Sequence, residues 1–324
     1  MLSKDHSVFI AGHLGMVGSS IYRLLKKQNF RNILTISRKE LDLRRKKEVS
    51  QWFTTHKPKI VILAAAKVGG ISANSNYPTE FLLENLEIQN NIIINAWKNN
   101  TKRLLFLGSS CIYPKYANQP IKEEELLSGY LETTNESYAL AKIVGIKLCN
   151  SLREQYNFDA ISLMPTNLYG PGDNYHPEDS HVLAALIRRF CLAKLENKEV
   201  VTCWGSGNVY REFLHVDDLA RACLHVLQNW HPSKNNAPKS SNGIPLSHLN
   251  VGTGKDLSIK ELALKIAKFV DYDGEINWDS SKPDGTPRKK LDITRIQNIG
   301  WEPKISLDQG LKRTIKEFKK LQTY

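Results

Sequence analysis

Three residues of this 324-residue chain have the types and spacing needed to deliver a proton to a carbonyl oxygen. Tyr138 and Lys142 lie four positions apart, so on a helix they share one face. A free tyrosine has a pKa of about 10, and a nearby ammonium group is expected to lower it. Ser109 follows an apolar segment, and its hydroxyl can donate a hydrogen bond to the same oxygen. This set suits the reduction of a ketone by hydride transfer, with tyrosine supplying the proton.

A glycine-rich turn near the start of the chain has the spacing of a nucleotide-binding loop. Gly12, Gly15 and Gly18 form a GxxGxxG pattern between an expected strand and an expected helix. Such glycines let the backbone approach a pyrophosphate, and the next helix offers free N–H groups. About 20 residues beyond the glycines, a NAD site usually has an acidic residue, but here Arg38 is found. An arginine there favours NADP, whose 2′-phosphate it can pair with, although a solvated basic turn is the structural alternative.

Apolar segments alternate with helical patterns through the first half of the chain. We expect strands at 7–11, 33–37, 59–65, 103–108 and 160–164, and helices at 17–25, 49–54, 80–98 and 136–156. This alternation is typical of βαβ units, and it predicts an α/β fold with a Rossmann-type, doubly wound parallel sheet. Ser109 then lies at the carboxyl edge of that sheet, where ligands bind in such folds.

The pattern changes after residue 164. We expect loops at 165–180 and 282–289 and a mobile surface insertion at 230–247, because these segments are rich in residues such as Pro, Gly, Asn and Ser. Helices are expected at 180–195, 217–228 and 258–270, the last with Ser258 as its N-cap, and short strands at 200–204, 213–216 and 249–251. We therefore predict a Rossmann domain at 1–170, to which segments such as 205–250 return. A smaller, interleaved C-terminal lobe for substrate is expected mainly at 171–324.

The composition is that of a globular protein with excess positive charge. Hydrophobic residues make up 41% and charged residues 24%, which argues against wholesale disorder. Lys and Arg total 45 against 33 Asp and Glu, so the net charge is +12. This charge is compatible with nucleic acid, an anionic membrane or an acidic small molecule. Because the basic residues are scattered and form no contiguous stripe, we expect no nucleic-acid partner. No membrane partner is expected either, and the glycine turn favours an anionic small molecule.

The cysteines and the apolar runs bear on the compartment. The five cysteines are an odd number without a CxxC pattern, so neither a disulfide framework nor a zinc site is predicted. Reduced thiols favour a cytoplasmic location. The apolar run at 60–66 is far shorter than a membrane span, and no signal-peptide pattern is found. We expect no metal.

Seven stretches give the chain a specific resemblance to a known family. They are AAAKVGGI (64–71), LGSSCIYPK (107–115), YALAK (138–142), MPTNLYGP (164–171), SHV (180–182), REFLHVDD (211–218) and KPDGTPRK (282–289). Through them the chain resembles the extended short-chain dehydrogenases/reductases and, within these, the GDP-L-fucose synthase family. Enzymes of that family epimerise C3 and C5 of GDP-4-keto-6-deoxy-D-mannose and then reduce C4 with NADPH. The resemblance thus implies NADP(H), a GDP-sugar substrate and a homodimer.

The resemblance also implies roles for individual residues. The family's epimerising cysteine and histidine correspond to Cys111 and His181, whose side chains are both suited to moving protons. Ser109, Tyr138 and Lys142 correspond to the reductase triad. The implied substrate contacts are Arg189, Trp204, Arg211 and Asp284. The expected cofactor contacts are Gly12, Gly15, Met16, Val17, Gly18, Arg38, Leu107, Gly108, Ser109, Ser110, Lys142, Pro165, Thr166, Asn167, Leu168 and His181.

One residue departs from the family pattern, since Leu14 stands inside the glycine loop where many relatives have a basic residue. Arg38 is then the main residue expected to favour NADP over NAD. The basic residues after it, Lys39, Arg44, Arg45, Lys46 and Lys47, are expected to form a solvated face.

Two other functions stay open at this point. The first is a reductase or epimerase-reductase for a different GDP-deoxyhexose, against which the presence of Cys111 and His181 argues. The second is a non-catalytic NADP-binding protein, against which the intact triad argues.

Overall fold

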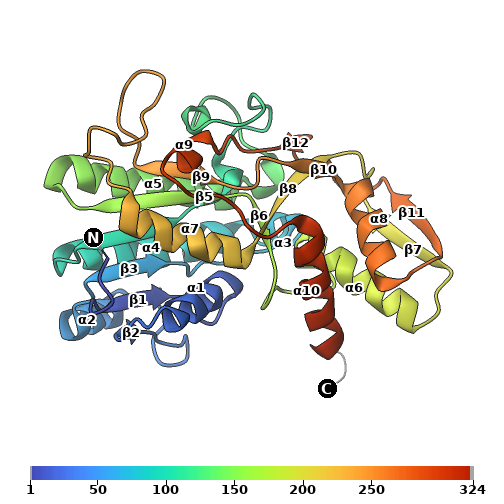
Figure 1. The fold of residues 1–324 in the computed structure, drawn as a ribbon, viewed down its shortest axis with the longest axis horizontal. Helices are drawn as coiled ribbons and strands as arrows, with labels where there is room; N and C mark the ends of the chain where they lie inside the picture. Colours follow the sequence, from blue (N-terminus) through green and yellow to red (C-terminus); the bar gives the residue numbers. More distant parts are fainter. Residues whose placement is uncertain (1, 322–324) are drawn as a thin grey trace.

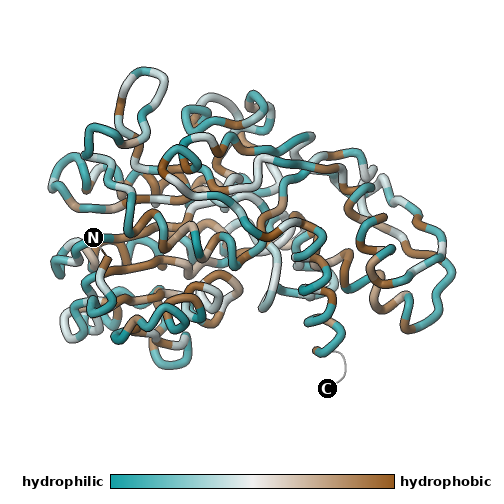
Figure 2. Tube along the Cα trace, in the orientation of Figure 1, coloured by the Kyte–Doolittle hydropathy of each residue, from teal (hydrophilic) through white to brown (hydrophobic). Residues whose placement is uncertain are grey.

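The computed structural model describes residues 2–321, and its centre is a six-stranded parallel sheet (Figure 1). Its strands run in the order β2 (Ile33–Leu34), β1 (Val8–Ala11), β3 (Ile60–Leu63), β4 (Arg103–Leu107), β5 (Ala160–Pro165) and β9 (His248–Val251). All residues of β1, β3, β4 and β5 are buried, as expected for strands covered on both faces. Figure 2 shows these strands as a hydrophobic interior.

Helices cover both faces of this sheet. The chain reverses its direction across the sheet after β2, so right-handed crossovers place α1 (Met16–Lys27) and α2 (Lys46–His56) on opposite faces. On one side α2 packs against α4 (Pro78–Lys98), and α4 packs against α5 (Glu136–Tyr156). On the other side α1 packs against α7 (Val216–Asn229). The predicted doubly wound α/β fold is confirmed.

A second group of elements surrounds its own hydrophobic core beside the sheet. α6 (Val182–Leu195), α8 (Ile259–Val270) and α10 (Leu307–Leu321) pack against one another. A parallel pair of strands, β7 (Val200–Trp204) and β11 (Glu275–Asp279), completes this part of the fold (Figure 1). Ser258 caps α8 through a capping box with Glu261, as the sequence predicted for its N-cap.

A small sheet around β8 (Tyr210–His215) connects the two parts. β8 pairs with β6 (Asn167–Tyr169), β10 (Asp256–Ser258) and β12 (Arg288–Lys289). These segments come from well-separated parts of the chain, so the second lobe is interleaved with the Rossmann part. The remaining elements are α3 (Ile71–Asn76), α9 (Thr294–Asn298) and the short 3-10 helices η1 (Ser110–Ile112), η2 (Glu123–Glu125) and η3 (Thr133–Asn135).

Three expectations about local structure are wrong. Residues 165–180 are not loop throughout, because Asn167–Tyr169 pair with β8. The second strand ends at Leu34 rather than residue 37. The segment 230–247 begins with a buried anchor rather than a mobile surface residue: Trp230 is 1% exposed, and its carbonyl accepts a hydrogen bond from the Arg103 guanidinium.

Two features are absent from residues 2–321. No helix there is long and apolar enough to cross a membrane. The same residues contain no group of three or more His, Cys, Asp and Glu side chains that could hold a metal ion.

Candidate active site

The glycine turn between β1 and α1 has the geometry of a pyrophosphate loop. A Cβ on Gly18 would lie 2.1 Å from the Gly12 carbonyl oxygen, and one on Gly12 would lie 2.7 Å from the Ala65 backbone, so both positions require glycine. No side chain caps α1 at Gly15. Its first N–H groups are therefore available to an anion, and the helix dipole favours negative charge there. This turn fits a dinucleotide cofactor.

Apart from Arg38 and His181, the remaining predicted cofactor residues lie at the carboxyl edge of the sheet, where the glycine turn also lies. The first segment is the start of α1, with Met16 and Val17. The second is the end of β4 and the residues after it, which are Leu107, Gly108, Ser109 and Ser110. The third runs from the end of β5 into β6 and contains Pro165, Thr166, Asn167 and Leu168. The ends of parallel strands thus bring segments from distant parts of the sequence together.

The three reductase residues converge at the end of β4. The Ser109 side chain forms a hydrogen bond with Tyr138, in the first turn of α5. One turn further along α5, Lys142 donates from Nζ to the Leu107 carbonyl at 2.9 Å. Its Nζ lies 5.8 Å from the centre of the Tyr138 ring. The serine, tyrosine and lysine of the predicted triad are therefore neighbours.

Burial dominates the electrostatics of this triad. It raises the pKa of Tyr138, the Cys111 charge raises it further, and the Ser109 hydrogen bond opposes the shift. Burial also lowers the pKa of Lys142 to about 7. The expectation that a nearby ammonium lowers the tyrosine pKa is therefore wrong for the protein alone, because desolvation outweighs it. Tyr138 keeps its proton at neutral pH, which is the state a proton donor requires.

The Cys111 thiol has two N–H donors beside it. Lys289 Nζ lies 3.5 Å and Asn135 Nδ2 3.6 Å from Cys111 Sγ. Lys289 is 8% exposed, so its charge acts where solvent screens it poorly. A cation and a polar donor stabilise a thiolate. The sequence analysis gave neither residue a role, although Lys289 ends the KPDGTPRK stretch and Asn135 immediately precedes α5.

His181 reaches the same region from the start of α6. The residue is exposed, yet desolvation by the surrounding protein lowers the pKa of its ring, and the charge of Lys289 lowers it further. The loop before His181 is held by Gly70, whose N–H donates to the Asp179 carbonyl at 2.9 Å. A Cβ on Gly70 would lie only 2.4 Å from the Ser180 carbonyl oxygen.

Two predicted substrate residues contact each other close to Cys111. Arg211, which is 9% exposed, donates from Nη2 to the Asp284 carbonyl at 3.0 Å. Burial lowers the pKa of Arg211, and the nearby charges of Cys111 and Asp284 oppose that shift. The Asp284 carboxylate accepts from the Ser206 N–H at 2.8 Å and from its hydroxyl at 2.7 Å. Asp284 thus holds a turn next to β7 with its carboxylate and orients Arg211 with its carbonyl.

The other two predicted substrate residues form a separate cluster on the second lobe. Arg189 Cζ lies 4.7 Å from the centre of the Trp204 ring, and Lys282 Nζ lies 5.4 Å from it. Arg189 also donates to the Thr202 carbonyl at 3.1 Å. Trp204 is 41% exposed, so it offers an aromatic surface flanked by two cations. Such a surface suits an anionic ligand with a planar base.

Glu212 is a structural residue of the site that the sequence analysis did not identify. Its carboxylate is fully buried and accepts N–H groups from Thr253, Gly254 and Leu291. Burial raises its pKa, and these N–H donors oppose the shift. Its carbonyl accepts from Thr166 Oγ1 at 3.1 Å. Glu212 therefore joins the segments that carry Thr166, Arg211 and Lys289.

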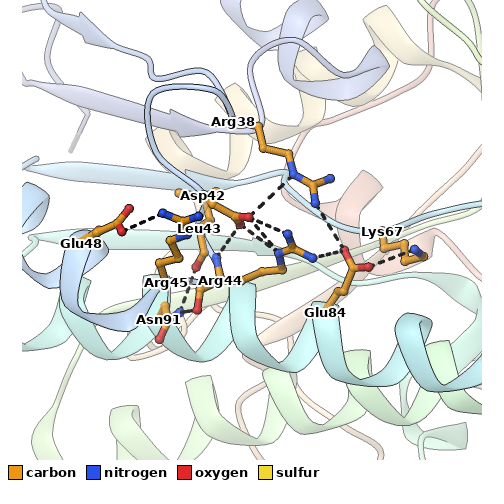
Figure 3. A network of polar contacts seen from close by, with 9 residues as sticks. All are labelled: Arg38, Asp42, Leu43, Arg44, Arg45, Glu48, Lys67, Glu84 and Asn91. Atoms are coloured by element: carbon orange, nitrogen blue, oxygen red, sulfur yellow. Dashed lines mark hydrogen bonds and ion pairs between the residues drawn. The ribbon is translucent and has the colours of Figure 1, made fainter.

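Arg38 lies in the segment after β2 and belongs to the network of polar contacts in Figure 3. Its side chain is 70% exposed and lies 4.0 Å from Asp42 and 3.9 Å from Glu84. The expectation that Arg44 belongs to a solvated face is wrong. Arg44 is 32% exposed and is bonded to the same two carboxylates.

A dinucleotide turn with a Ser–Tyr–Lys triad on this fold is typical of enzymes that use a nicotinamide dinucleotide. The chain matches the NAD dependent epimerase/dehydratase family over residues 8–239, and it belongs to that family. It is 53% identical over 319 residues to the GDP-L-fucose synthase of Escherichia coli K12, covering 98% of this chain and 97% of that protein. It is 51% identical over 314 residues to GDP-L-fucose synthase 1 of Arabidopsis thaliana, covering 97% and 93%. The resemblance inferred from the sequence is confirmed.

Solved structures agree. A GDP-L-fucose synthetase from Naegleria fowleri bound to NADP superimposes with a TM-score of 0.86 at 25% identity, covering 100% of this chain and 97% of that one. A GDP-6-OMe-4-keto-L-xylo-heptose reductase from C. jejuni gives a TM-score of 0.91 at 37% identity, covering 99% of both chains.

Proposed function

We propose that this protein is a GDP-L-fucose synthase, which converts GDP-4-keto-6-deoxy-D-mannose to GDP-L-fucose by epimerisation at C3 and C5 and NADPH-dependent reduction at C4. The observation that supports this proposal is that Lys289 lies close to both Cys111 and His181, and that Cys111 lies close to Tyr138 of the triad. The names of the relatives in E. coli and Arabidopsis support the same conclusion.

Epimerisation requires one group to remove a proton beside the ketone and another to return one on the opposite face. We assign removal of the proton to Cys111, whose Sγ lies 3.5 Å from the Lys289 ammonium nitrogen. His181 then supplies the proton. Each epimerisation leaves Cys111 protonated and His181 deprotonated. Before the second carbon reacts, Cys111 therefore releases its proton to solvent and His181, an exposed residue, takes one up.

Reduction then uses the triad. Tyr138 donates its proton to the C4 oxygen, and Ser109 holds that oxygen by a hydrogen bond. Lys142 is already anchored on the Leu107 carbonyl, so its ammonium lies close to the tyrosine when negative charge develops there. Bound NADPH would supply the hydride.

We assign the cofactor to the glycine turn, with Arg38 at its 2′-phosphate. The GDP-sugar is assigned to Arg211 and Asp284 near the sugar and to Arg189 and Trp204 near the nucleotide. Charge-assisted hydrogen bonds from arginines suit a diphosphate, and the exposed Trp204 ring suits a base or sugar face. Residues 1–170, with returns from 205–250, would then bind the cofactor, while 171–324 mainly bind the substrate.

The proposal includes a cytoplasmic homodimer formed through α4 and α5. These two helices pack together and expose apolar side chains to solvent. Leu83 on α4 is 53% exposed, and Leu140 and Val144 on α5 are 42% and 44% exposed. An apolar surface of this kind is typical of an interface between subunits.

A second candidate is a reductase for a different GDP-sugar with one epimerisation or none. It is favoured by the strong similarity to the C. jejuni heptose reductase and by 38% identity to a GDP-L-colitose synthase of Yersinia pseudotuberculosis.

Solvent deuterium exchange separates these candidates. Without NADPH, GDP-4-keto-6-deoxy-D-mannose in D2O should take up deuterium at C3 and C5 with the wild-type protein. Cys111→Ala should abolish this uptake, and Cys191→Ala, which removes a half-buried thiol of α6, should leave it intact. Uptake at only one carbon would favour the second candidate, and undiminished uptake in Cys111→Ala would contradict the assigned role of the thiol.

A further inference from the structure

Two carboxylates lie where they would oppose a 2′-phosphate. Asp42 Oδ2 and Glu84 Oε2 are 4.0 and 3.9 Å from the Arg38 guanidinium (Figure 3). NAD sites use an acidic residue after the second strand to bind the ribose 2′-hydroxyl, and Asp42 lies in the segment that follows β2, whereas Glu84 lies on α4. If no other cation neutralised them, Asp42 and Glu84 would pair with the Arg38 guanidinium and would also repel a phosphate. A single exposed arginine against two carboxylates would give a poor NADP site.

Arg44 compensates both of these carboxylates. It donates to Asp42 in a fork, with Nε–Oδ1 at 3.0 Å and Nη2–Oδ2 at 2.6 Å. Its Nη1 lies 3.2 Å from Glu84 Oε2. These distances are much shorter than those from Arg38, so Arg44 is the main partner of both anions. The hydrogen bonds from Arg44 are the largest cause of the low pKa of Asp42, about 2.

The backbone holds this arrangement in place. Asn91 on α4 donates from Nδ2 to the Leu43 and Arg44 carbonyls, both at 2.9 Å. On the other side of Glu84, Lys67 Nζ lies 3.1 Å from Oε1. The Lys67 backbone is fixed by two hydrogen bonds with Asn85. Arg44 and Lys67 together therefore offset the charge of Asp42 and Glu84, which leaves the exposed donors of Arg38 available.

We propose that Arg44 determines the preference for a 2′-phosphate by neutralising Asp42 and Glu84, so that Arg38 stays free to bind the phosphate. Arg44 is a positioning residue, because it acts on the phosphate through the carboxylates and Arg38. This inference rests on the proposed use of NADP(H). It accounts for a preference that a single exposed arginine, with Leu14 in the glycine loop, would support weakly.

The test measures binding of two mononucleotide probes by calorimetry, with no substrate and no turnover. Adenosine 2′,5′-bisphosphate contains the 2′-phosphate and 5′-AMP lacks it. In Arg44→Leu the bisphosphate should bind about five- to tenfold more weakly, as expected for exposing carboxylates about 4 Å from the binding cation, and 5′-AMP should change less than twofold. Arg45→Leu is the matched control, since Arg45 pairs with Glu48 instead of this network and has the same charge.

Two further variants keep the proposal falsifiable if Arg44→Leu folds poorly. Glu84→Gln should tighten binding of the bisphosphate with little effect on 5′-AMP. The double variant Asp42→Asn/Arg44→Leu, in which Lys67 still pairs with Glu84, should regain most of the affinity lost in Arg44→Leu. Equal weakening of both probes in Arg44→Leu would overturn the proposal, since it indicates a damaged loop. Failure of the double variant to recover would also overturn it, since it indicates direct contact between Arg44 and the phosphate. A wild-type protein that does not distinguish the probes would instead contradict the NADP(H) assignment itself.

Discussion

Replacing Gly70 by alanine should separate the epimerase and cofactor-binding activities. Gly70 has φ −69°, so alanine can adopt this backbone conformation without strain. The added Cβ, however, would lie 2.4 Å from the Ser180 carbonyl oxygen, next to His181. Because an ordinary contact at this position needs 3.4 Å or more, the 179–181 segment must move by about 1 Å.

A displacement of that size is large for a proton-transfer residue. A misplacement of about 1 Å can lower a rate about 100-fold. We therefore expect Gly70→Ala to slow deuterium uptake at C3 and C5 by about 100-fold, measured by NMR without cofactor. The expected cofactor contacts other than His181, including the glycine turn and Arg38, lie on other segments, so the NADPH dissociation constant should change much less than the exchange rate.

Gly129→Ala is the control for this experiment, since its Cβ would lie 3.4 Å from the nearest atom, in ordinary contact. It should exchange deuterium at the wild-type rate. Uptake at the wild-type rate in Gly70→Ala would refute the steric argument. If Gly70→Ala lost NADPH binding to the same extent, the claim that this substitution disturbs only the 179–181 segment would be refuted.

Three further predictions concern the triad, the Cys111 environment and a partly buried acid, Asp173. Tyr138→Phe should lower NADPH oxidation by about 10²- to 10⁴-fold with cofactor binding and deuterium uptake retained; lost uptake would contradict separate roles for Tyr138 and Cys111. Lys289→Gln should raise the pKa of His181, followed by NMR titration, because Lys289 lowers it in the wild type; an unchanged pKa would contradict this coupling. Burial raises the pKa of Asp173 from 3.8 to about 7, and Glu317 adds to the shift. The folded protein then holds a proton that the unfolded chain loses in this interval, so the free energy of unfolding falls as pH rises from 3.8 to about 7. By denaturant titration, Asp173→Asn should be more stable than wild type by about 1–4 kcal/mol at pH 8 and equal to it below pH 4; a constant difference would contradict the shift.

The features predictable from the sequence are those that depend on local patterns. Tyr138 and Lys142 share a helix face because they are four residues apart, and the buried strands are continuous apolar runs. The strands β6, β10 and β12 were missed because each has only two or three residues, too few for a periodic pattern. Their pairing partner, β8, lies elsewhere in the sequence.

The parts of the site that were missed depend on contacts between distant segments. Lys289 lies 178 residues from Cys111 and reaches it because β12 pairs with β8. Glu84, on α4, meets Arg44 only when the chain after β2 folds back over that helix. The pKa of Tyr138 was expected to fall because the sequence spacing reveals the nearby Lys142. The burial of Tyr138, which raises its pKa instead, depends on the whole fold and could not be predicted from the spacing.

The central claim is tested most directly by identifying the product formed in D2O. GDP-4-keto-6-deoxy-D-mannose and NADPH should be incubated with the protein, and the sugar nucleotide analysed by NMR. The account predicts GDP-L-fucose with deuterium at both C3 and C5. A C4-reduced sugar with unchanged C3 and C5 configuration and no deuterium there would contradict it.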